Sequence, residues 1–247
     1  MSEYQENAEF WKRDDQKRVI GDWLARLPSV SMVSLGGGER VLEAGCGTGW
    51  VARRLANTGA KVYGCDREPN MLQEARAAEQ RFPRGIEYEQ ADIANMPYAE
   101  RYFDAITCIA VLIHASPEEC LSFFKEAFRV LKNYGRIAIS TMDPYVYQPE
   151  SPNRNGRSSW SQYTPLTDRP MSESQPFHED YRDRDGNVFS STVWYHPEGM
   201  LPALMREAGL TVCRHQRMYV TKEVLRESNQ EGEDGYPAFC QYLAVKK

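Results

Sequence analysis

Three glycines at alternate positions, Gly45, Gly47 and Gly49, constrain this chain more than any other feature. An apolar stretch with one acid, residues 41–44, comes before them, and residues 51–56, which have the composition of a helix, follow. The pattern predicts a strand, a tight turn and the start of a helix. Because glycine has no Cβ, the backbone can turn sharply there and a ligand can come close. The helix N-terminus beyond the turn offers unpaired N–H groups, which suit a carboxylate or a phosphate.

The spacing of the glycines separates several nucleotide-binding turns. A dinucleotide fingerprint, G-x-G-x-x-G, needs glycine where this chain has Trp50, and a P-loop needs a lysine that is missing here. The pattern E-x-G-x-G-x-G, which starts at Glu43, instead resembles the first motif of the class I S-adenosylmethionine (SAM)-dependent methyltransferases. The alternative is a glycine-rich turn that binds nothing.

A second acid follows at the spacing that a nucleoside site requires. Residues 61–66 form a short predicted strand that ends at Asp66, 21 residues after Gly45. An acid there can accept hydrogen bonds from both ribose hydroxyls. In the family that this chain resembles, the acid is followed after a few residues by Met-Leu, and Met71 begins that pair here. The simpler alternative is an aspartate that only forms a turn.

Two further segments extend the resemblance. Residues 86–90 alternate as a strand does, and the family places an acid and an apolar residue after it, here Asp92 for the adenine amino group and Ile93 for the ring. The near-continuous apolar run 102–114 predicts a central strand covered on both faces. Its last residues, Ala110 to His114, are expected to face the sulfonium of SAM. The resemblance implies a site for SAM, and for its product S-adenosylhomocysteine (SAH), formed by Glu43, Gly45, Cys46, Gly47, Gly49, Trp50, Asp66, Arg67, Met71, Asp92, Ile93 and Ala110.

The fold implied is α/β, with a Rossmann-like seven-stranded, mostly parallel sheet, helices on both faces, an antiparallel last strand and a cap insertion. A helix is predicted from the N-cap Ser116 through Lys132, and the next strand at residues 136–141. The last helix is expected within residues 197–209 and a closing hairpin at 210–220 and 239–245. The expected division is an N-terminal helical lid at 1–35, a SAM-binding core at 36–142, an acceptor cap at 143–196, and a helix and hairpin at 197–247 that complete the core.

Two segments lie outside the shared core. Apolar residues at helical spacing predict an amphipathic helix within residues 1–35, which either covers a sheet edge or closes as a lid. Residues 143–196 are rich in aromatic and turn-forming residues, and residues 185–187 predict a hairpin turn. In the family, an insertion at this point usually caps the acceptor site; the alternative is a surface insertion that contacts no ligand.

Composition limits the partners. The net charge of -5 and the dispersed lysines and arginines argue against a nucleic-acid partner, which would need a basic patch. No run approaches the roughly 20 apolar residues that span a bilayer, and the polar N-terminus does not read as a signal peptide. The six scattered cysteines predict free thiols in a cytoplasmic protein with no metal site. A monomer or a homodimer is expected.

The reaction implied is methyl transfer to an O or N atom of a small-molecule metabolite. The donor is already activated, so the protein mainly aligns the acceptor and excludes water, and it needs a base only when the acceptor is protonated. The candidates for that base are His114, His178 and Tyr145, with His196 as a further histidine. The alternatives are a tRNA or RNA methyltransferase, and a SAM-binding protein that transfers no methyl group.

Overall fold

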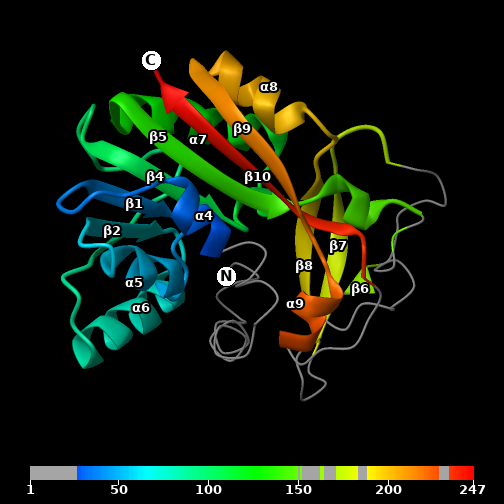
Figure 1. Ribbon diagram of the computed structural model, residues 1–247, viewed down its shortest axis with the longest axis horizontal. Helices are drawn as coiled ribbons and strands as arrows, with labels where there is room; N and C mark the ends of the chain where they lie inside the picture. Colours follow the sequence, from blue (N-terminus) through cyan, green and yellow to red (C-terminus); the bar gives the residue numbers. More distant parts are fainter. Residues whose placement is uncertain (1–26, 150, 152–161, 164–170, 183–187, 228–233) are drawn as a thin grey trace.

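The computed structural model describes residues 27–149, 151, 162–163, 171–182, 188–227 and 234–247. In this part of the chain a seven-stranded sheet forms the core, in the order β3-β2-β1-β4-β5-β10-β9 (Figure 1). The pairs among β1 to β5 are parallel, and β10 is antiparallel to both β5 and β9. The strands are β1 (Arg40–Ala44), β2 (Lys61–Asp66), β3 (Glu87–Gln90), β4 (Phe103–Ile109), β5 (Leu131–Met142), β9 (Leu210–Tyr219) and β10 (Pro237–Lys246). The predicted sheet with an antiparallel last strand is therefore confirmed.

Helices cover both faces of the sheet. On β1, Val41 packs into one apolar cluster and its neighbour Leu42 into another, as alternation along a strand requires. The first cluster includes side chains of α4 (Leu27–Met32) and α5 (Trp50–Ala56), and the second includes those of α7 (Pro117–Val130) and α8 (Met200–Glu207). Helix α6 (Pro69–Arg81) contacts β2 and β3 and lies beside α5 (Figure 1).

Helix α7 begins as the sequence predicts. The Ser116 hydroxyl accepts a hydrogen bond from Glu119 N, and the Glu119 carboxylate accepts one from Ser116 N, which together form a capping box. The helix ends at Val130, earlier than predicted, and β5 begins at Leu131. The reason is pairing: Leu131 already lies opposite Phe103 of β4, and an irregular register follows before the regular ladder.

Strand β4 ends before its apolar run does. The prediction that the strand continues to His114 is wrong, because the strand ends at Ile109 and Ala110 adopts a left-handed φ of 58°. The Ala110 N–H donates to Ser140 O of β5, which stabilises the bend. The next residues form the short 3-10 helix η2 (Leu112–His114). His114 therefore lies on a helical turn beyond the sheet.

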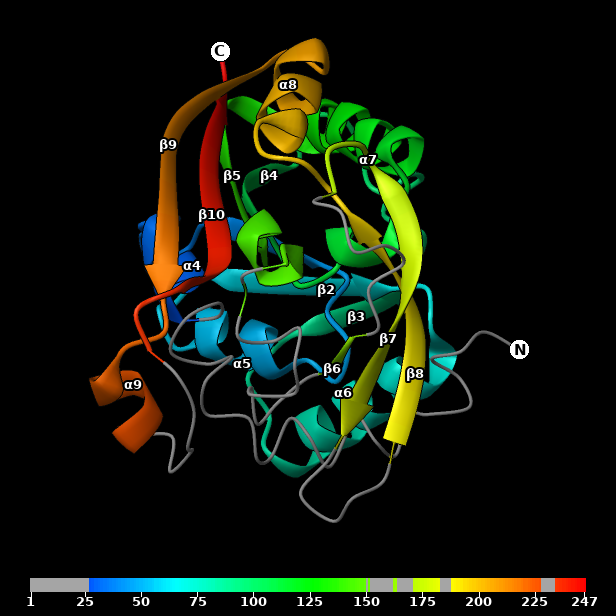
Figure 2. The same ribbon diagram turned by 90° about the vertical axis from the view of Figure 1, so that its right-hand side faces the viewer.

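The insertion after β5 forms a second, smaller sheet beyond the carboxyl end of β5 (Figures 1 and 2). It starts with the 3-10 helix η3 (Pro144–Tyr147). Strands β7 (Gln175–Arg182) and β8 (Val188–Tyr195) form the antiparallel pair that the turn signal predicts, and β6 (Gln162–Tyr163) pairs with β7. A last short helix, α9 (Lys222–Glu227), connects β9 toward β10. Most of the expected N-terminal lid, residues 1–26, lies outside the described residues.

Candidate functional site

The three glycines of the turn after β1 all have left-handed φ angles, of 72°, 52° and 77°. A Cβ at Gly45 would collide with the side chain of Val111, and one at Gly49 would collide with the Tyr88 hydroxyl. A Cβ at Gly47, in contrast, would meet no atom of the described residues within 4 Å. The outer two glycines are thus needed for packing, whereas the middle one leaves open space above the backbone.

Asp66, at the end of β2, connects this turn to its neighbouring strand. One carboxylate oxygen accepts a hydrogen bond from Gly47 N at 2.8 Å, and the other accepts one from Glu68 N at 3.0 Å. Burial raises the pKa of Asp66 above its ordinary value, and the two backbone hydrogen bonds oppose that shift. Cys65 O accepts from both Gly45 N and Cys46 N, at 2.8 and 2.9 Å. The turn and the end of β2 therefore form one hydrogen-bonded unit with a carboxylate beside open space.

Several predicted cofactor residues lie around this unit but are buried. Glu43 is 2% exposed and accepts a hydrogen bond from the Thr107 hydroxyl on β4. The Cys46 thiol is buried, and this desolvation raises its pKa well above the ordinary value. Trp50 is 9% exposed, and the Arg54 guanidinium lies 3.0 Å from the centre of its ring. Met71 is buried on α6.

The remaining predicted cofactor residues are more accessible. Arg67 is 55% exposed and pairs with Glu68 at 3.4 Å. Asp92 is exposed and accepts from Ala94 N at 2.8 Å, while Ile93 is half-buried against the cluster that contains α7. Ala110 is exposed at the end of β4. The structure thus places Asp66, Asp92 and Ala110 at the carboxyl ends of β2, β3 and β4, on the edge of the sheet where open α/β sheets bind ligands.

Helix α7 fixes the loop that follows Asp92, a contact that sequence reasoning missed. Arg129 donates to Tyr98 O at 2.8 Å and to Met96 O at 3.0 Å. Glu126 accepts from Met96 N at 2.8 Å and pairs with Arg129 at 2.6 Å. The acid and base are separated by three positions on the helix, which places them on one face. The spacing of Glu126 and Arg129 could be read from the sequence, but the loop that they contact could not.

Two of the candidate bases, His114 and His178, lie where the second sheet meets the turn after β4. His114 is half-buried, and its Nδ1 lies 3.3 Å from Thr192 O on β8. His178 is exposed on β7, with its Nδ1 3.5 Å from the Thr192 hydroxyl. Tyr145 is half-buried on η3. The structure therefore brings His114 and His178 to the same residue, although they are far apart in sequence.

His196 takes a structural position. It is 8% exposed, and its Nε2 lies 2.9 Å from Leu112 O, so the ring donates to η2. Burial lowers the pKa of His196 below its ordinary value. The ring of His215, on β9, stacks on the ring of Tyr242, on β10, with the ring centroids 4.7 Å apart.

A buried carboxylate that the sequence did not reveal, Asp143, joins the insertion to the sheet. It is fully buried and follows β5 directly. It accepts hydrogen bonds from Tyr145 N at 2.9 Å and from the Cys240 thiol at 3.0 Å, and it pairs with Arg217 Nε at 3.0 Å. Arg217 also pairs with Glu198 at 2.9 Å. Asp143 thus holds η3, and with it Tyr145, against β9 and β10.

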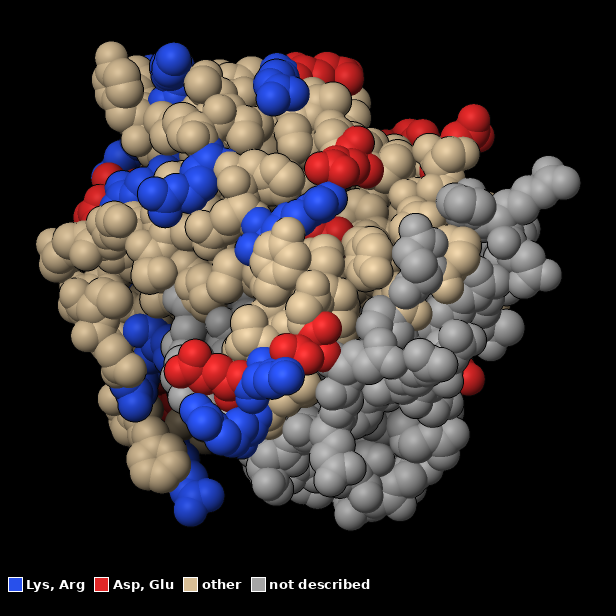
Figure 3. All heavy atoms as spheres, turned by 45° about the vertical axis from the view of Figure 1, so that its right-hand side comes forward, with Lys and Arg blue, Asp and Glu red and all other residues tan. Residues whose placement is uncertain are grey.

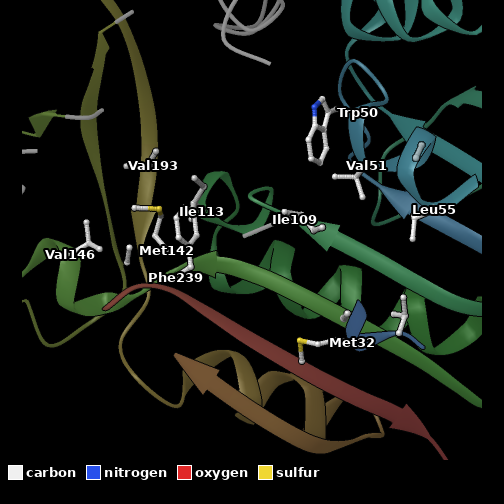
Figure 4. Packing of buried hydrophobic residues seen from close by; sticks show 14 of the residues in the cluster. Met32, Trp50, Val51, Leu55, Ile109, Ile113, Met142, Val146, Val193 and Phe239 are labelled. Atoms are coloured by element: carbon white, nitrogen blue, oxygen red, sulfur yellow. The ribbon is translucent and has the colours of Figure 1, made fainter. Parts of the chain in front are cut away.

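Apolar side chains gather between the two sheets. Figure 4 shows Ile113, Met142, Val193 and Phe239 grouped where β8 meets the carboxyl end of β5, with Trp50 pointing from α5 toward the end of β4. These residues belong to one buried cluster that continues from the α5 face of the main sheet into the insertion. An apolar wall therefore adjoins the histidines and the glycine turn.

The distribution of charged side chains, and of groups that could bind a metal ion, bears on which ligands the molecule can take. On the face in Figure 3, basic side chains form several small groups with acidic ones beside some of them. In the described ranges, no three His, Cys, Asp or Glu side chains are placed to bind a metal ion.

Five of the six free cysteines are buried and Cys213 is exposed. No helix among the described residues combines the length and the apolar character that crossing a bilayer demands.

Comparison with known proteins adds to this geometry. A family described as "Methyltransferase domain" matches residues 42–139. A demethylmenaquinone methyltransferase from Tropheryma whipplei is 37% identical over 114 residues, which are 46% of this chain and 46% of that protein. The chain thus spans about half the length of the curated relatives that it matches.

Solved structures share the fold over most of the chain. A SAM-dependent methyltransferase from Methanosarcina mazei superposes with a TM-score of 0.66 and 18% identity, over 89% of this chain and 97% of that one. The 1,6-didemethyltoxoflavin-N1-methyltransferase of Burkholderia thailandensis was solved with 1,6-didemethyltoxoflavin and SAH. It superposes with a TM-score of 0.58 and 16% identity, over 99% of this chain and 84% of that one. At these identities the likeness is one of fold.

Proposed function

Residues 42–139 belong to the class I SAM-dependent methyltransferase family, and on this premise we propose that the protein transfers a methyl group from SAM to an O or N atom of a small molecule. The observation that carries the proposal is the space above Gly47, which the described residues leave open, beside the Asp66 carboxylate. A nucleoside needs both: close approach to the backbone, and an acceptor for its ribose hydroxyls.

The residues present fit SAM. Asp66 already accepts one hydrogen bond at each carboxylate oxygen, and each oxygen has capacity for another, so it would hold the ribose. Asp92 and Ile93 would contact the adenine. Glu43, Cys46, Trp50, Arg67, Met71 and Ala110 would complete the surroundings of the cofactor, some through the packing that supports the turn.

When bound, SAM supplies a methyl group that is already activated by its positive sulfur. The chain's task is then to orient the acceptor, to exclude water and to accept a proton where the acceptor carries one. The apolar wall of Ile113, Met142, Val193 and Phe239 supports exclusion of water. His114 would accept the proton, with His178 and Tyr145 of the insertion as the alternatives.

The acceptor that fits best is a small molecule with an apolar ring system. Tyr145 packs against this apolar wall, and small-molecule sites are mostly apolar with a few polar groups. The relative from T. whipplei is named for demethylmenaquinone and the protein from B. thailandensis for 1,6-didemethyltoxoflavin. The net charge of -5 argues against an RNA acceptor. Residues 143–196 and the N-terminal segment would form the cap that sets specificity.

The test has two stages. Isothermal calorimetry should show about one equivalent of SAH bound per chain and no binding of NAD. SAH release is then measured with a panel of acceptors: demethylmenaquinone, simple phenols and hydroquinones, heteroaromatic amines and total tRNA. Turnover on tRNA alone would overturn the small-molecule proposal. SAH binding without turnover on any acceptor would favour a binding protein, and NAD binding without SAH binding would overturn both.

A further inference from the structure

Two histidines join η2 to β8 in opposite directions. His114, on η2, lies with Nδ1 3.3 Å from Thr192 O of β8. His196, directly after β8, lies with Nε2 2.9 Å from Leu112 O of η2. Each segment therefore contributes one imidazole to a carbonyl of the other. We call these four residues, His114, Thr192, His196 and Leu112, the histidine clasp.

The partners in the clasp determine which ring nitrogen carries a proton. A carbonyl oxygen can only accept, so His114 must donate from Nδ1 and His196 from Nε2. A neutral imidazole has one N–H and one lone pair. The lone pair of His114 is therefore on Nε2.

The carbonyl of Thr192 is held firmly. Its neighbours along β8, Ser191 and Val193, are both fully buried, and β8 is paired to β7 along its whole length. Among the described strands, the order β6-β7-β8 makes β8 an edge strand of the small sheet, and β8 contacts η2. The Thr192 hydroxyl also lies 3.5 Å from His178 Nδ1. A rigid strand of the insertion thus sets the position of His114.

From this geometry we propose that the histidine clasp makes His114 Nε2 the proton acceptor of the methyl-transfer reaction, with Thr192 and His196 as positioning residues. The proposal rests on the proposed function. Nε2 takes the proton from the acceptor group as that group's electron pair forms the bond to the methyl carbon. The electron pair of the broken carbon–sulfur bond remains on sulfur, and the positive charge passes to the imidazolium.

The clasp also links the insertion to catalysis. Because the hydrogen bonds join η2 at the end of β4 to a strand of the insertion, displacement of β8 would release the constraint on the His114 ring. The ring would then sample both tautomers, and Nε2 would carry a proton for part of the time. Seating of the insertion would thereby control the fraction of molecules that hold a competent base.

The first experiment needs neither cofactor nor acceptor. Nitrogen-15 imidazole spectra of the whole protein report the protonated nitrogen of each of its four histidines, and single-histidine variants assign the signals. We expect Nδ1–H for His114 and Nε2–H for His196. An Nε2–H tautomer at His114 overturns the proposal. This measurement does not depend on SAM. A negative result can therefore be told apart from a failure of the proposed function, which calorimetry with SAH detects.

Matched substitutions separate the base from its support. His114→Asn keeps an amide N–H near the position of Nδ1 but has no base. We expect its melting temperature and SAH affinity to stay close to wild type, while kcat, with the fastest acceptor of the panel, falls roughly 100- to 10,000-fold. If turnover persists in His114→Asn, the ring is only structural and the proposal is wrong.

The positioning role of His196 has its own pair of variants. His196→Ala removes the donor to Leu112 O, whereas His196→Gln keeps an amide N–H near the position of Nε2. In His196→Ala we expect a mixture of His114 tautomers and a loss of kcat of roughly 10- to 100-fold, with KM for SAM unchanged. His196→Gln should restore both. If His196→Ala does not fold, a shifted His114 tautomer in His196→Gln overturns the role. If His196→Ala folds and His114 keeps a single Nδ1–H tautomer, the role is overturned as well.

Discussion

Asp66 accepts a hydrogen bond of 2.8 Å from the backbone nitrogen of Gly47, so the acid at the end of β2 holds the middle of the glycine turn. The same carboxylate accepts a second bond from Glu68 N. An acid at a strand end need not contribute to the stability of a fold. Here it has two roles, because the groups that it would offer to a ribose also shape the turn.

Asp66→Ala is therefore expected to affect both binding and stability. SAM affinity should fall roughly 10- to 100-fold, since a charged hydrogen bond contributes on the order of 1.5–3 kcal/mol. Without ligand, the free energy of unfolding should fall by about 1–3 kcal/mol, because two backbone N–H groups lose their acceptor. Calorimetry and denaturant unfolding measure these effects. Asp66→Asn, which keeps one acceptor oxygen, should lose less of both, and wild-type SAM affinity in Asp66→Ala would remove this residue from the site.

The glycines of the turn provide a matched comparison. In Gly47→Ala the new methyl group meets no atom of the described residues within 4 Å, so the cost to stability should be only the left-handed backbone, about 1–2 kcal/mol. Its SAM affinity should fall more steeply, because the methyl group fills the ligand's space. Gly45→Ala should instead destabilise the unliganded fold strongly, since its Cβ collides with Val111. The prediction is wrong if Gly47→Ala binds SAM as wild type does.

Asp143 and Arg217 form the ion pair that holds the insertion. Arg217→Met leaves a fully buried carboxylate without its counter-charge, which should lower the free energy of unfolding by about 2–4 kcal/mol. The double variant Asp143→Asn/Arg217→Met should recover part of this loss, because no buried charge is left unpaired. Lys222→Met, on the exposed helix α9, is the control and should be neutral. Equal stability of Arg217→Met and this control would argue against a structural ion pair.

His196 should make the stability depend on pH in a defined direction. Its folded-state pKa is lowered by burial, so as the pH falls the unfolded chain takes up a proton first. Stability is therefore fully present above the unfolded value, about 6.5, and is lost as the pH falls through the lower folded value. Urea unfolding from about pH 7.5 to 5 should show this slope. In His196→Gln the slope should be smaller, and an identical slope would assign the effect to other groups.

Most of the sheet could be predicted because each motif lies at a strand end. The acids Asp66 and Asp92 follow strands at fixed distances from the glycine turn, so their common edge follows from parallel pairing alone. The capping residues Ser116 and Glu119 likewise act within one turn of helix. Such features depend on neighbours in sequence, and the sequence therefore contains them.

The features that escaped prediction depend on distant contacts. Ala110 gives no sign of a left-handed conformation, since alanine prefers right-handed backbone; its hydrogen bond to Ser140 O holds the bend. The meeting of His114 with Thr192 requires the insertion to fold against the end of β4. Asp143 looks like a loop residue until Arg217 and Cys240 are brought to it.

The place of β10 in the sheet has a consequence for the order of folding. β10 lies between β5 and β9, although it follows both in the chain, and among the described strands β9 pairs with β10 alone. As a nascent chain emerges, β9 has no partner until β10 has been synthesised. Arg217 on β9 and Cys240 on β10, which hold Asp143, therefore take their places late. A chain folded only through β5 would have its glycine turn formed while Tyr145 still lacked its anchor.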